Sequence, residues 1–145
     1  MLKLNNQDIT VIILTHNEEV HLERCILSLI KKVKEIIIID SYSTDNTKKI
    51  SQKYDLRFYT HKFINHSNQL NWALKKIKFK TNWLLRIDAD EIVESKFFEK
   101  LKKIKNLNNF KKKNIKIENI FFKKKLKYEG FFTQNQIRIW KKNFG

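Results

Sequence analysis

The chain has 145 residues, a length that suggests one domain and allows about 70% of the unfolded surface to be buried. Its 41% hydrophobic content excludes a disordered chain, despite a formal net charge of +16. Both glycines, Gly130 and Gly145, lie late in the sequence, which excludes a glycine-rich phosphate loop and a dinucleotide-binding fingerprint.

Residues 1–95 alternate between two hydrophobic patterns. Short β-branched runs are typical of strands buried on both faces, and longer segments with apolar side chains at helical spacing are typical of helices. In chain order they predict a strand at 9–14, a helix at 18–33, a strand at 36–39, a helix ending near 54, a strand at 57–60, a helix at 67–79 and a strand at 83–87. This alternation predicts an α/β fold, with a parallel sheet and helices on both faces.

Residues 96–145 are strongly basic. They carry 16 basic and 3 acidic side chains, whereas residues 1–95 carry 15 and 12. The pattern predicts a helix at 95–105, a polar loop at 106–114, a strand around Ile115 and Ile117 that could extend to Ile120, and a strand at 136–140. The net charge therefore belongs mainly to the last third of the chain.

Cysteine usage and hydropathy indicate the compartment. Cys25 is the single cysteine, so no internal disulfide forms, and with four histidines it makes no zinc pattern. No apolar run approaches the ~20 residues that a membrane-spanning helix needs, and residues 9–14 are too short for a signal-peptide core. We therefore expect a reduced, cytoplasmic protein.

Polar residues follow three of the predicted strands. The carboxyl ends of parallel strands open on one edge of a sheet, and open α/β sheets bind ligands there. The three strand exits are Thr15-His16-Asn17-Glu18, Asp40-Ser41-Tyr42-Ser43 and Asp88-Ala89-Asp90. The sequence therefore predicts a binding site at this edge.

Asp88 and Asp90 flank one small residue at the end of a buried strand. Alternate residues of a continuing strand point the same way, so the two carboxylates can converge on one cation. Mg²⁺ and Mn²⁺ prefer such oxygen ligands. The alternative is a pair of solvated loop acids, but the two other polar strand exits on the same edge favour the metal site.

The other strand exits allow two interpretations each. Asp40 could accept a hydrogen bond from a nucleobase or a ribose hydroxyl, or it could cap a turn or the following helix. The His16 ring could stack on a base and the Asn17 amide could read its edge, whereas taken alone these residues form only a polar loop.

Together, these motifs resemble the inverting family 2 glycosyltransferases of the GT-A fold. More narrowly, they resemble the bacterial branch that adds sugars to the core of lipopolysaccharide or lipooligosaccharide. The resemblance rests on segments in the family's order at 15–19, 40–47, 69–74 and 83–91, with a looser match at 130–142. It implies a Rossmann-like, mostly parallel sheet and the transfer of a hexose, with inversion, from a UDP-sugar to a glycan or lipid-linked acceptor.

The resemblance also implies roles for individual residues. Its nucleotide-binding set is His16, Asn17, Glu18, Asp40, Gln69, Asn71 and Asp88. Within that set His16 would pack on the uracil, and Asp40 would bond the uracil or ribose. Asp90 would ligate a divalent cation, Mg²⁺ or Mn²⁺, that bridges the diphosphate, and Asp88 would contact the ribose or the outer shell of the metal. Arg138 would lie near the acceptor.

This chain departs from the family pattern at several positions, among them Leu70, where the family has a basic residue, and Thr133-Gln134, where the branch has a proline and an aspartate. The glycines usual before Gln69 are replaced by Asn65-His66-Ser67-Asn68. The catalytic base, a His-Glu pair in this branch, is expected beyond Gly145, and Glu129 is the one late acid near the expected face. We therefore expect a nucleotide-sugar-binding core at 1–95 and an acceptor-side segment at 96–145 of the same, C-terminally shortened domain. The alternative function is a non-catalytic remnant that binds nucleotide sugars.

Three interpretations of the basic segment stay open. Its lysines could simply face water, which is the usual role of a charge run. They could attach the protein to the inner face of the cytoplasmic membrane, where each lysine near anionic lipid contributes about 1 kcal/mol. They could also contact nucleic acid, because aromatic residues lie between them. Nothing in residues 8–95 supports that third partner, so we predict no nucleic acid.

Overall fold

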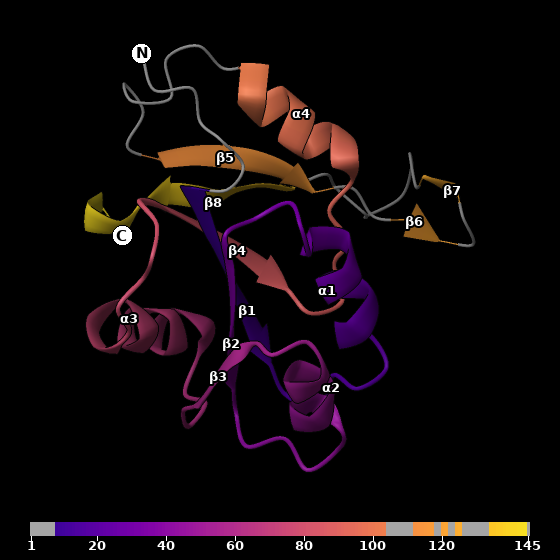
Figure 1. The fold of residues 1–145 in the computed structure, drawn as a ribbon, viewed down its shortest axis with the longest axis vertical. Coiled ribbons are helices and arrows are strands. Elements are labelled where there is room, and N and C mark those ends of the chain that lie inside the picture. Colours follow the sequence, from indigo (N-terminus) through magenta and orange to yellow (C-terminus); the bar gives the residue numbers. More distant parts are fainter. Residues whose placement is uncertain (1–7, 104–111, 118–119, 122–123, 126–133, 145) are drawn as a thin grey trace.

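A six-stranded sheet, in the order β3-β2-β1-β4-β8-β5, forms the centre of the part of the chain that the structure describes (Figure 1). The structure is a computed structural model that describes residues 8–103, 112–117, 120–121, 124–125 and 134–144. Its elements are β1 (Ile9–Thr15), α1 (Leu22–Leu29), β2 (Glu35–Asp40), α2 (Thr47–Lys53), β3 (Arg57–Thr60), α3 (His66–Lys76), β4 (Trp83–Asp88), α4 (Ser95–Lys103), β5 (Lys112–Ile117), β6 (Ile120–Phe121), β7 (Lys124–Lys125), β8 (Gln134–Lys141) and a final 3₁₀ turn (Lys142–Phe144).

The pairing of the strands makes the sheet mostly parallel. β1 pairs in parallel with β2 and β4, and β2 pairs in parallel with β3. β8 runs antiparallel between β4 and β5. In this register Thr15 lies opposite Asp40, and Leu14 lies opposite Asp88. The predicted α/β sheet is confirmed, and the polar ends of β1, β2 and β4 lie side by side.

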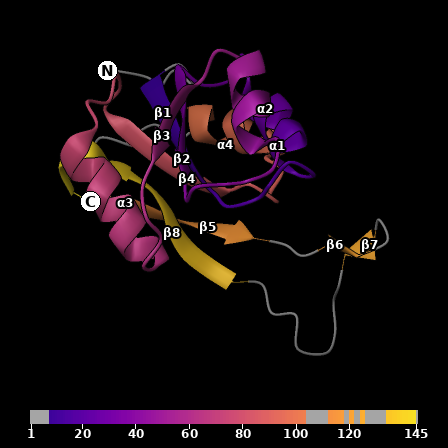
Figure 2. The same cartoon turned by 90° about the horizontal axis from the view of Figure 1, so that it is seen from below.

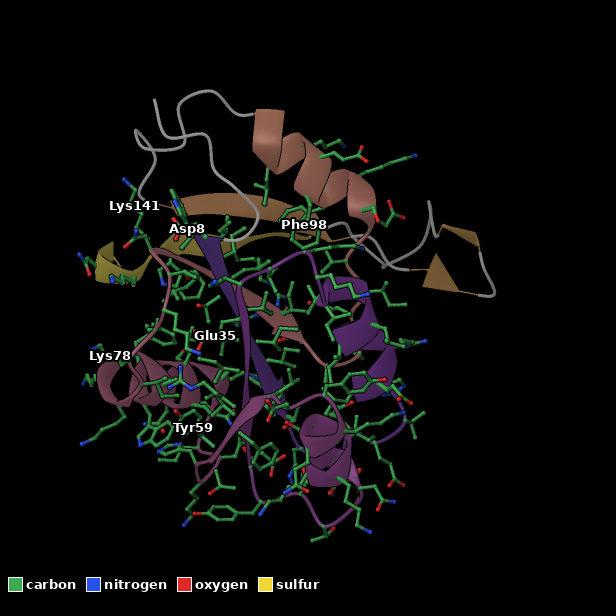
Figure 3. The ribbon with its side chains drawn as sticks, viewed as in Figure 1. Asp8, Glu35, Tyr59, Lys78, Phe98 and Lys141 are labelled. Atoms are coloured by element: carbon green, nitrogen blue, oxygen red, sulfur yellow. The ribbon has the colours of Figure 1, made fainter. Side chains whose placement is uncertain are left out.

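Helices cover both faces of this sheet. Helices α1, α2 and α4 lie on one face and α3 lies on the other, as Figure 1 and Figure 2 show from two directions. Alternate residues of β1 serve the two faces, since Val11 and Ile13 pack in the cluster with α1 whereas Ile12 packs with α3. Phe98 points from α4 toward the sheet (Figure 3). The continuous β-branched runs of the sequence therefore supply two cores at once.

Two predicted helices are longer than the observed ones. Instead of starting at Glu18, α1 starts at Leu22, because residues 18–21 form a separate turn in which the Glu18 carbonyl accepts from the His21 N–H at 3.0 Å. It ends at Leu29 because Ile30 is extended, with ψ 141°. Helix α3 ends at Lys76, since the next residue, Ile77, is also extended.

The basic segment also differs from its prediction. The loop predicted at 106–114 is wrong at its end, because β5 already begins at Lys112 and pairs with β8. Ile120 does not extend that strand but lies in β6, which pairs with β7. Pairing with β8 brings residues 112–114 into the sheet although their lysines and asparagine have low strand propensity.

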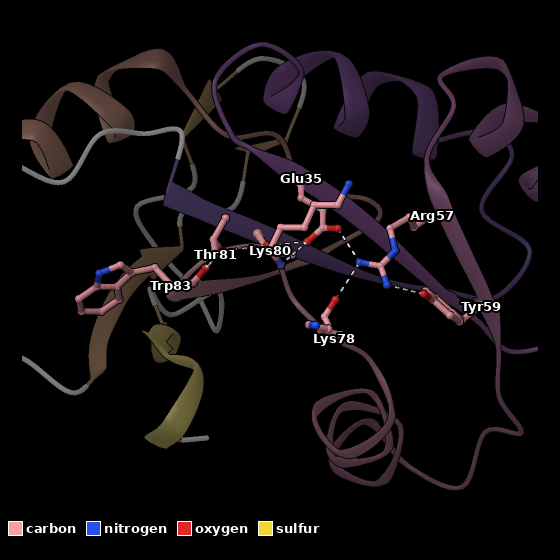
Figure 4. Close-up of polar contacts among 8 residues, drawn as sticks. Glu35, Arg57, Tyr59, Lys78, Lys80, Thr81 and Trp83 are labelled. Atoms are coloured by element: carbon pink, nitrogen blue, oxygen red, sulfur yellow. Dashed lines mark hydrogen bonds and ion pairs between the residues drawn. The ribbon is translucent and has the colours of Figure 1, made fainter.

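A buried ion pair closes the amino edge of the sheet (Figure 4). The Glu35 side chain is 4% exposed, and its Oε1 accepts a hydrogen bond from Arg57 Nη1 at 2.6 Å. Its other oxygen accepts from Thr10 Oγ1 at 2.9 Å and from the Lys80 N–H at 3.2 Å. Arg57 also donates to the Tyr59 hydroxyl. Both oxygens of this carboxylate are thus satisfied within the protein, as burial of a charge requires.

Candidate functional site at the carboxyl edge of the sheet

A cavity of about 430 Å³ opens at the carboxyl ends of β1 and β4. This volume is in the range of small-molecule sites. Among the residues that the sequence singled out, those lining it are His16, Glu18, Gln69, Asp88 and Asp90. Asn17, Asp40, Asn71 and Arg138 do not line it, and Glu129 lies outside the described residues. The edge predicted from the strand exits therefore carries a cavity.

Asp40 is buried inside the turn that follows β2. Its carboxylate accepts hydrogen bonds from Thr15 Oγ1 at 2.7 Å and from the Ser43 N–H at 2.8 Å. The Ser43 hydroxyl donates to it at 2.5 Å. Of the two interpretations that the sequence left open, this geometry is that of a turn cap. A contact between Asp40 and a nucleoside stays a prediction.

Asn17 joins the loops after β1 and β2. Its φ of 55° lies in the left-handed region, which asparagine adopts more readily than most residues. Its N–H donates to Ser43 Oγ at 2.8 Å, and its side-chain oxygen accepts from the Thr44 N–H at 2.9 Å. These bonds tie together the two loops that carry the cavity-lining residues His16 and Ser41.

His16 lines the cavity and bonds to the loop after β2. Its Nδ1 lies 2.9 Å from the Ser41 carbonyl oxygen, which can only accept, so Nδ1 carries the proton. Because the side chain is exposed and lines the cavity, its ring face is available for stacking.

Gln69 and Glu18 complete this side of the cavity. Gln69 is 1% exposed, and its amide donates to the Ile39 carbonyl at 3.1 Å and to Ser41 Oγ at 2.8 Å. It therefore holds the end of β2 in place from α3. The Glu18 carboxylate lies 3.1 Å from His21 Nδ1, and its backbone N–H donates to Thr47 Oγ1 at 2.8 Å.

The opposite side of the cavity is the turn at 88–91. Arg138 of β8 is 3% exposed and lies 3.2 Å from Asp88 Oδ2 and 3.1 Å from Glu91 Oε1. Sequence reasoning missed both this pairing and Glu91. Burial raises the pKa of the Glu91 carboxyl, although the Asp88 N–H and the Arg138 charge oppose the rise. The acceptor-side role of Arg138 stays a prediction.

Asp90 differs from its neighbours because its side chain is exposed and has no hydrogen bond or ion pair within the described residues. Among those residues no group of three or more His, Cys, Asp or Glu side chains is placed to hold a metal ion. Two carboxylates, Asp88 and Asp90, nevertheless line one cavity. Mg²⁺ commonly takes one or two carboxylates together with substrate phosphates, so this donor set fits such a cation.

Two aromatic residues that the sequence did not single out also line the cavity. Phe63 is 49% exposed, and its ring lies 5.4 Å from the His66 ring in an edge-to-face arrangement. Both come from the start of α3 and the loop before it. Their only sequence signal was an aromatic residue in a polar stretch.

The chain belongs to glycosyl transferase family 2, because the family model matches residues 10–135. It is 34% identical over 98 residues to the lipopolysaccharide core biosynthesis glycosyltransferase LpsC of Rhizobium meliloti, covering 64% of this chain and 35% of LpsC. Its fold is similar to that of S. aureus TarS, with a TM-score of 0.54 at 22% identity over 73% of this chain and 34% of that one.

A third similarity is to glucosyl-3-phosphoglycerate synthase from Mycobacterium tuberculosis, in a crystal structure with Mg²⁺ and UDP. The TM-score is 0.50 at 26% identity, and the match covers 59% of this chain and 34% of that one. Across the first curated relatives the chain spans only 26–35% of their own length. Within the described residues, no helix has both the length and the apolar character needed to cross a membrane.

Proposed function

We propose that this chain binds the donor of an inverting glycosyltransferase, a UDP-hexose held with a divalent cation. The observation that carries the proposal is the cavity that gathers His16, Gln69, Asp88 and Asp90 at one edge of the sheet. The similar synthase from Mycobacterium tuberculosis, crystallised with Mg²⁺ and UDP, supports it. The cavity volume of about 430 Å³ also suits a nucleotide.

Different residues would bind the cation and the base of the donor. Asp90, with Asp88 beside it, would hold the cation, and His16 would offer its ring face to the base. When bound, the cation supplies charge neutralisation for the diphosphate as it leaves. No glycine-rich loop is present, so these carboxylates take over the task of holding the phosphates through the cation.

The acceptor is the second part of the proposal. Similarity to LpsC supports a glycan or lipid-linked hydroxyl in lipopolysaccharide or lipooligosaccharide synthesis. An inverting transfer needs a base to deprotonate that hydroxyl on the face opposite the leaving group. A cytoplasmic location, inferred from cysteine usage and hydropathy, is part of the same proposal. Contact of the basic segment at 96–145 with anionic lipid is inferred from its charge.

Calorimetric titration with UDP, with and without Mn²⁺, tests donor binding. Mn²⁺ should tighten UDP binding to the unchanged chain, and Asp90→Asn should weaken binding in Mn²⁺ by about tenfold or more. Asp55→Asn is the matched control, because Asp55 is an exposed carboxylate at the opposite edge, just before β3. Mn²⁺-dependent UDP binding that is equal in Asp90→Asn and the unchanged chain would contradict the proposal.

Release of UDP from a panel of UDP-sugars, with and without glycan acceptors, tests the transfer step. Donor-specific release that depends on the acceptor supports a glycosyltransferase activity of this chain. Binding of UDP with no release for any donor supports the alternative, a chain that binds nucleotide sugars without transferring them.

A further inference from the structure

We propose that Arg138 and Glu91 are positioning residues, which hold the turn at 88–91 so that Asp88 and Asp90 can bind a divalent cation together with UDP. This inference rests on the proposed function. It assigns to Arg138, a residue of β8, a task on the donor side of the sheet. Three features of the turn support it.

The first feature is a reciprocal pair of hydrogen bonds that closes the turn. The Glu91 N–H donates to the Asp88 carbonyl at 3.0 Å, and the Asp88 N–H donates to Glu91 Oε2 at 2.9 Å. The Glu91 side chain therefore acts as a clamp on the backbone of Asp88. This clamp fixes the turn without glycine, while the Ala89 side chain between them is buried in the core.

The second feature is the guanidinium of Arg138, which bridges both ends of the turn. Its Nη2 donates to Glu91 Oε1 at 3.1 Å, and its Nη1 lies 3.2 Å from Asp88 Oδ2 and 3.4 Å from Glu91 Oε2. A planar fork can serve two carboxylates in this way, whereas a lysine ammonium acts as a single point charge. The bridge fixes the Asp88 carboxylate relative to the clamp.

The third feature is the distribution of charge. Three of the four residues at 88–91 are acidic, so their carboxylates repel one another. Arg138 offsets two of them, and Arg86 Nε lies 3.7 Å from Asp88 Oδ1. Asp90 alone keeps its carboxylate exposed at the cavity, with no ion pair among the described residues. The arrangement therefore orients one carboxylate and leaves the next open to a cation.

An arginine paired with a carboxylate can also serve stability alone, and the ion pair at the amino edge of the sheet supplies the control. There Arg57 forms a comparable ion pair with the buried carboxylate of Glu35 at 2.6 Å, far from the cavity. Loss of either arginine should lower the melting temperature, because Arg57→Met leaves the buried Glu35 carboxylate without its partner and Arg138→Met leaves the half-buried carboxylates of Asp88 and Glu91 without theirs. Only loss of Arg138 should affect cation binding.

The experiment compares Arg138→Met, Arg138→Lys and Glu91→Gln with the control Arg57→Met. For each folded variant, the dissociation constant of UDP is measured by calorimetry without and with Mn²⁺. The readout is the constant without Mn²⁺ divided by the constant with Mn²⁺, which gives the factor by which Mn²⁺ tightens UDP binding. We expect the ratio to fall about 10–100-fold in Arg138→Met and Glu91→Gln, the usual range for residues that orient metal ligands. The ratio for Arg138→Lys should lie between those of these two variants and that of the unchanged chain. The ratio for Arg57→Met should equal that of the unchanged chain.

The outcomes separate this inference from the proposed function. If folded Glu91→Gln and Arg138→Lys both have the same ratio as the unchanged chain, the inference is overturned, even where Arg138→Met does not fold. An equal loss in Arg57→Met also overturns it, since the effect is then general destabilisation. If Mn²⁺ does not change UDP binding to the unchanged chain, the proposed cation site itself fails and the inference fails with it.

Discussion

The two edges of the sheet use the same kind of ion pair in different ways. At the amino edge, Arg57 donates to one oxygen of the Glu35 carboxylate, and Thr10 Oγ1 and the Lys80 N–H donate to the other. At the carboxyl edge, Arg138 satisfies Asp88 and Glu91, while Asp90 between them stays exposed at a cavity. The amino-edge network thus satisfies both oxygens of its carboxylate within the protein, whereas the carboxyl-edge network leaves one carboxylate exposed at the cavity.

The position of each arginine in the chain adds to this difference. Arg57 and Glu35 begin adjacent parallel strands, so local βαβ topology brings them together. Arg138 reaches Glu91 across 47 residues of sequence, through the antiparallel pairing of β8 with β4. The carboxyl edge therefore depends on a long-range contact, whereas the amino edge depends on a contact between neighbouring strands.

The reactivity of the Cys25 thiol tests whether the core layer under the turn at 88–91 excludes water and reagents. Burial, reinforced by the nearby carboxylates of Glu91, Asp90 and Asp88, raises the pKa of this thiol from 9.0 to about 12. At a given pH the folded chain thus holds about a thousandfold less thiolate than the unfolded chain. Alkylation at pH 8, followed by mass spectrometry, should be slower in the folded chain by at least that factor, because the thiol is also buried away from the reagent.

The control for this reaction is an exposed thiol on the same helix. Leu27 is 54% exposed on α1, so Leu27→Cys in a Cys25→Ser background should react rapidly without unfolding. Equal alkylation rates for Cys25 in the folded chain and in guanidinium would contradict a closed layer beneath the turn.

Glu35→Ala tests the amino edge and should have the largest effect on stability. It leaves the Arg57 guanidinium without its carboxylate, and loss of one partner of a buried pair costs about 3 kcal/mol of unfolding free energy. We expect the lower part of the usual range, because Arg57 is 32% exposed and can be partly hydrated. Urea denaturation followed by circular dichroism measures the change.

The matched control is Glu99→Ala on the exposed side of α4, for which we expect no resolvable change. Mn²⁺-dependent UDP binding by the folded fraction should be the same in both variants. A loss of that dependence in Glu35→Ala would mean that the two edges are coupled.

The pH dependence of stability tests the Glu35 carboxylate at the amino edge, with a smaller expected effect than that of Glu35→Ala. Burial alone would raise the pKa of Glu35, but hydrogen bonds from Arg57, Thr10 and the Lys80 N–H bring it below the ordinary value of 4.5. The folded chain therefore keeps this carboxylate ionised where the unfolded chain takes up a proton. Its stabilising contribution is complete above pH 4.5 and is lost as the pH falls through the lowered pKa.

Melting temperatures measured between about pH 3 and pH 6 check this expectation. The unchanged chain should lose stability more steeply below pH 4.5 than Glu35→Gln, which carries no titrating group at this position. Identical slopes for the two proteins would show that the carboxylate is not held ionised by its partners.

The sequence predicted the location of the cavity because strand ends are encoded locally. Each apolar run stops at a polar residue, and parallel pairing places the ends of β1, β2 and β4 at one edge. Local signals were less reliable for helix boundaries. Glu19 lies within the helix predicted at 18–33, but in the structure it is in a turn before α1, and its carboxylate accepts a hydrogen bond from the Asn46 N–H at 2.9 Å.

The partner of Arg138 could not be predicted in the same way. No periodicity links residue 138 to the turn at 88–91, because their contact depends on where β8 enters the sheet and in which direction. The wall formed by Phe63 and His66 depends likewise on how the loop before α3 folds back over the cavity. Residue types at strand ends are readable from sequence, whereas long-range partners require the assembled sheet.

The position of β8 between β4 and β5 also gives this protein an order of assembly during synthesis. β4 leaves the ribosome about 50 residues before β8, a delay of roughly 3–10 s at ordinary translation rates. Throughout that interval β4 is the open border of a nascent parallel sheet, and its acidic turn has no counter-charge from Arg138. We expect the nascent chain to depend most on chaperones at this stage, until β8 covers that border and brings the Arg138 charge to Asp88 and Glu91.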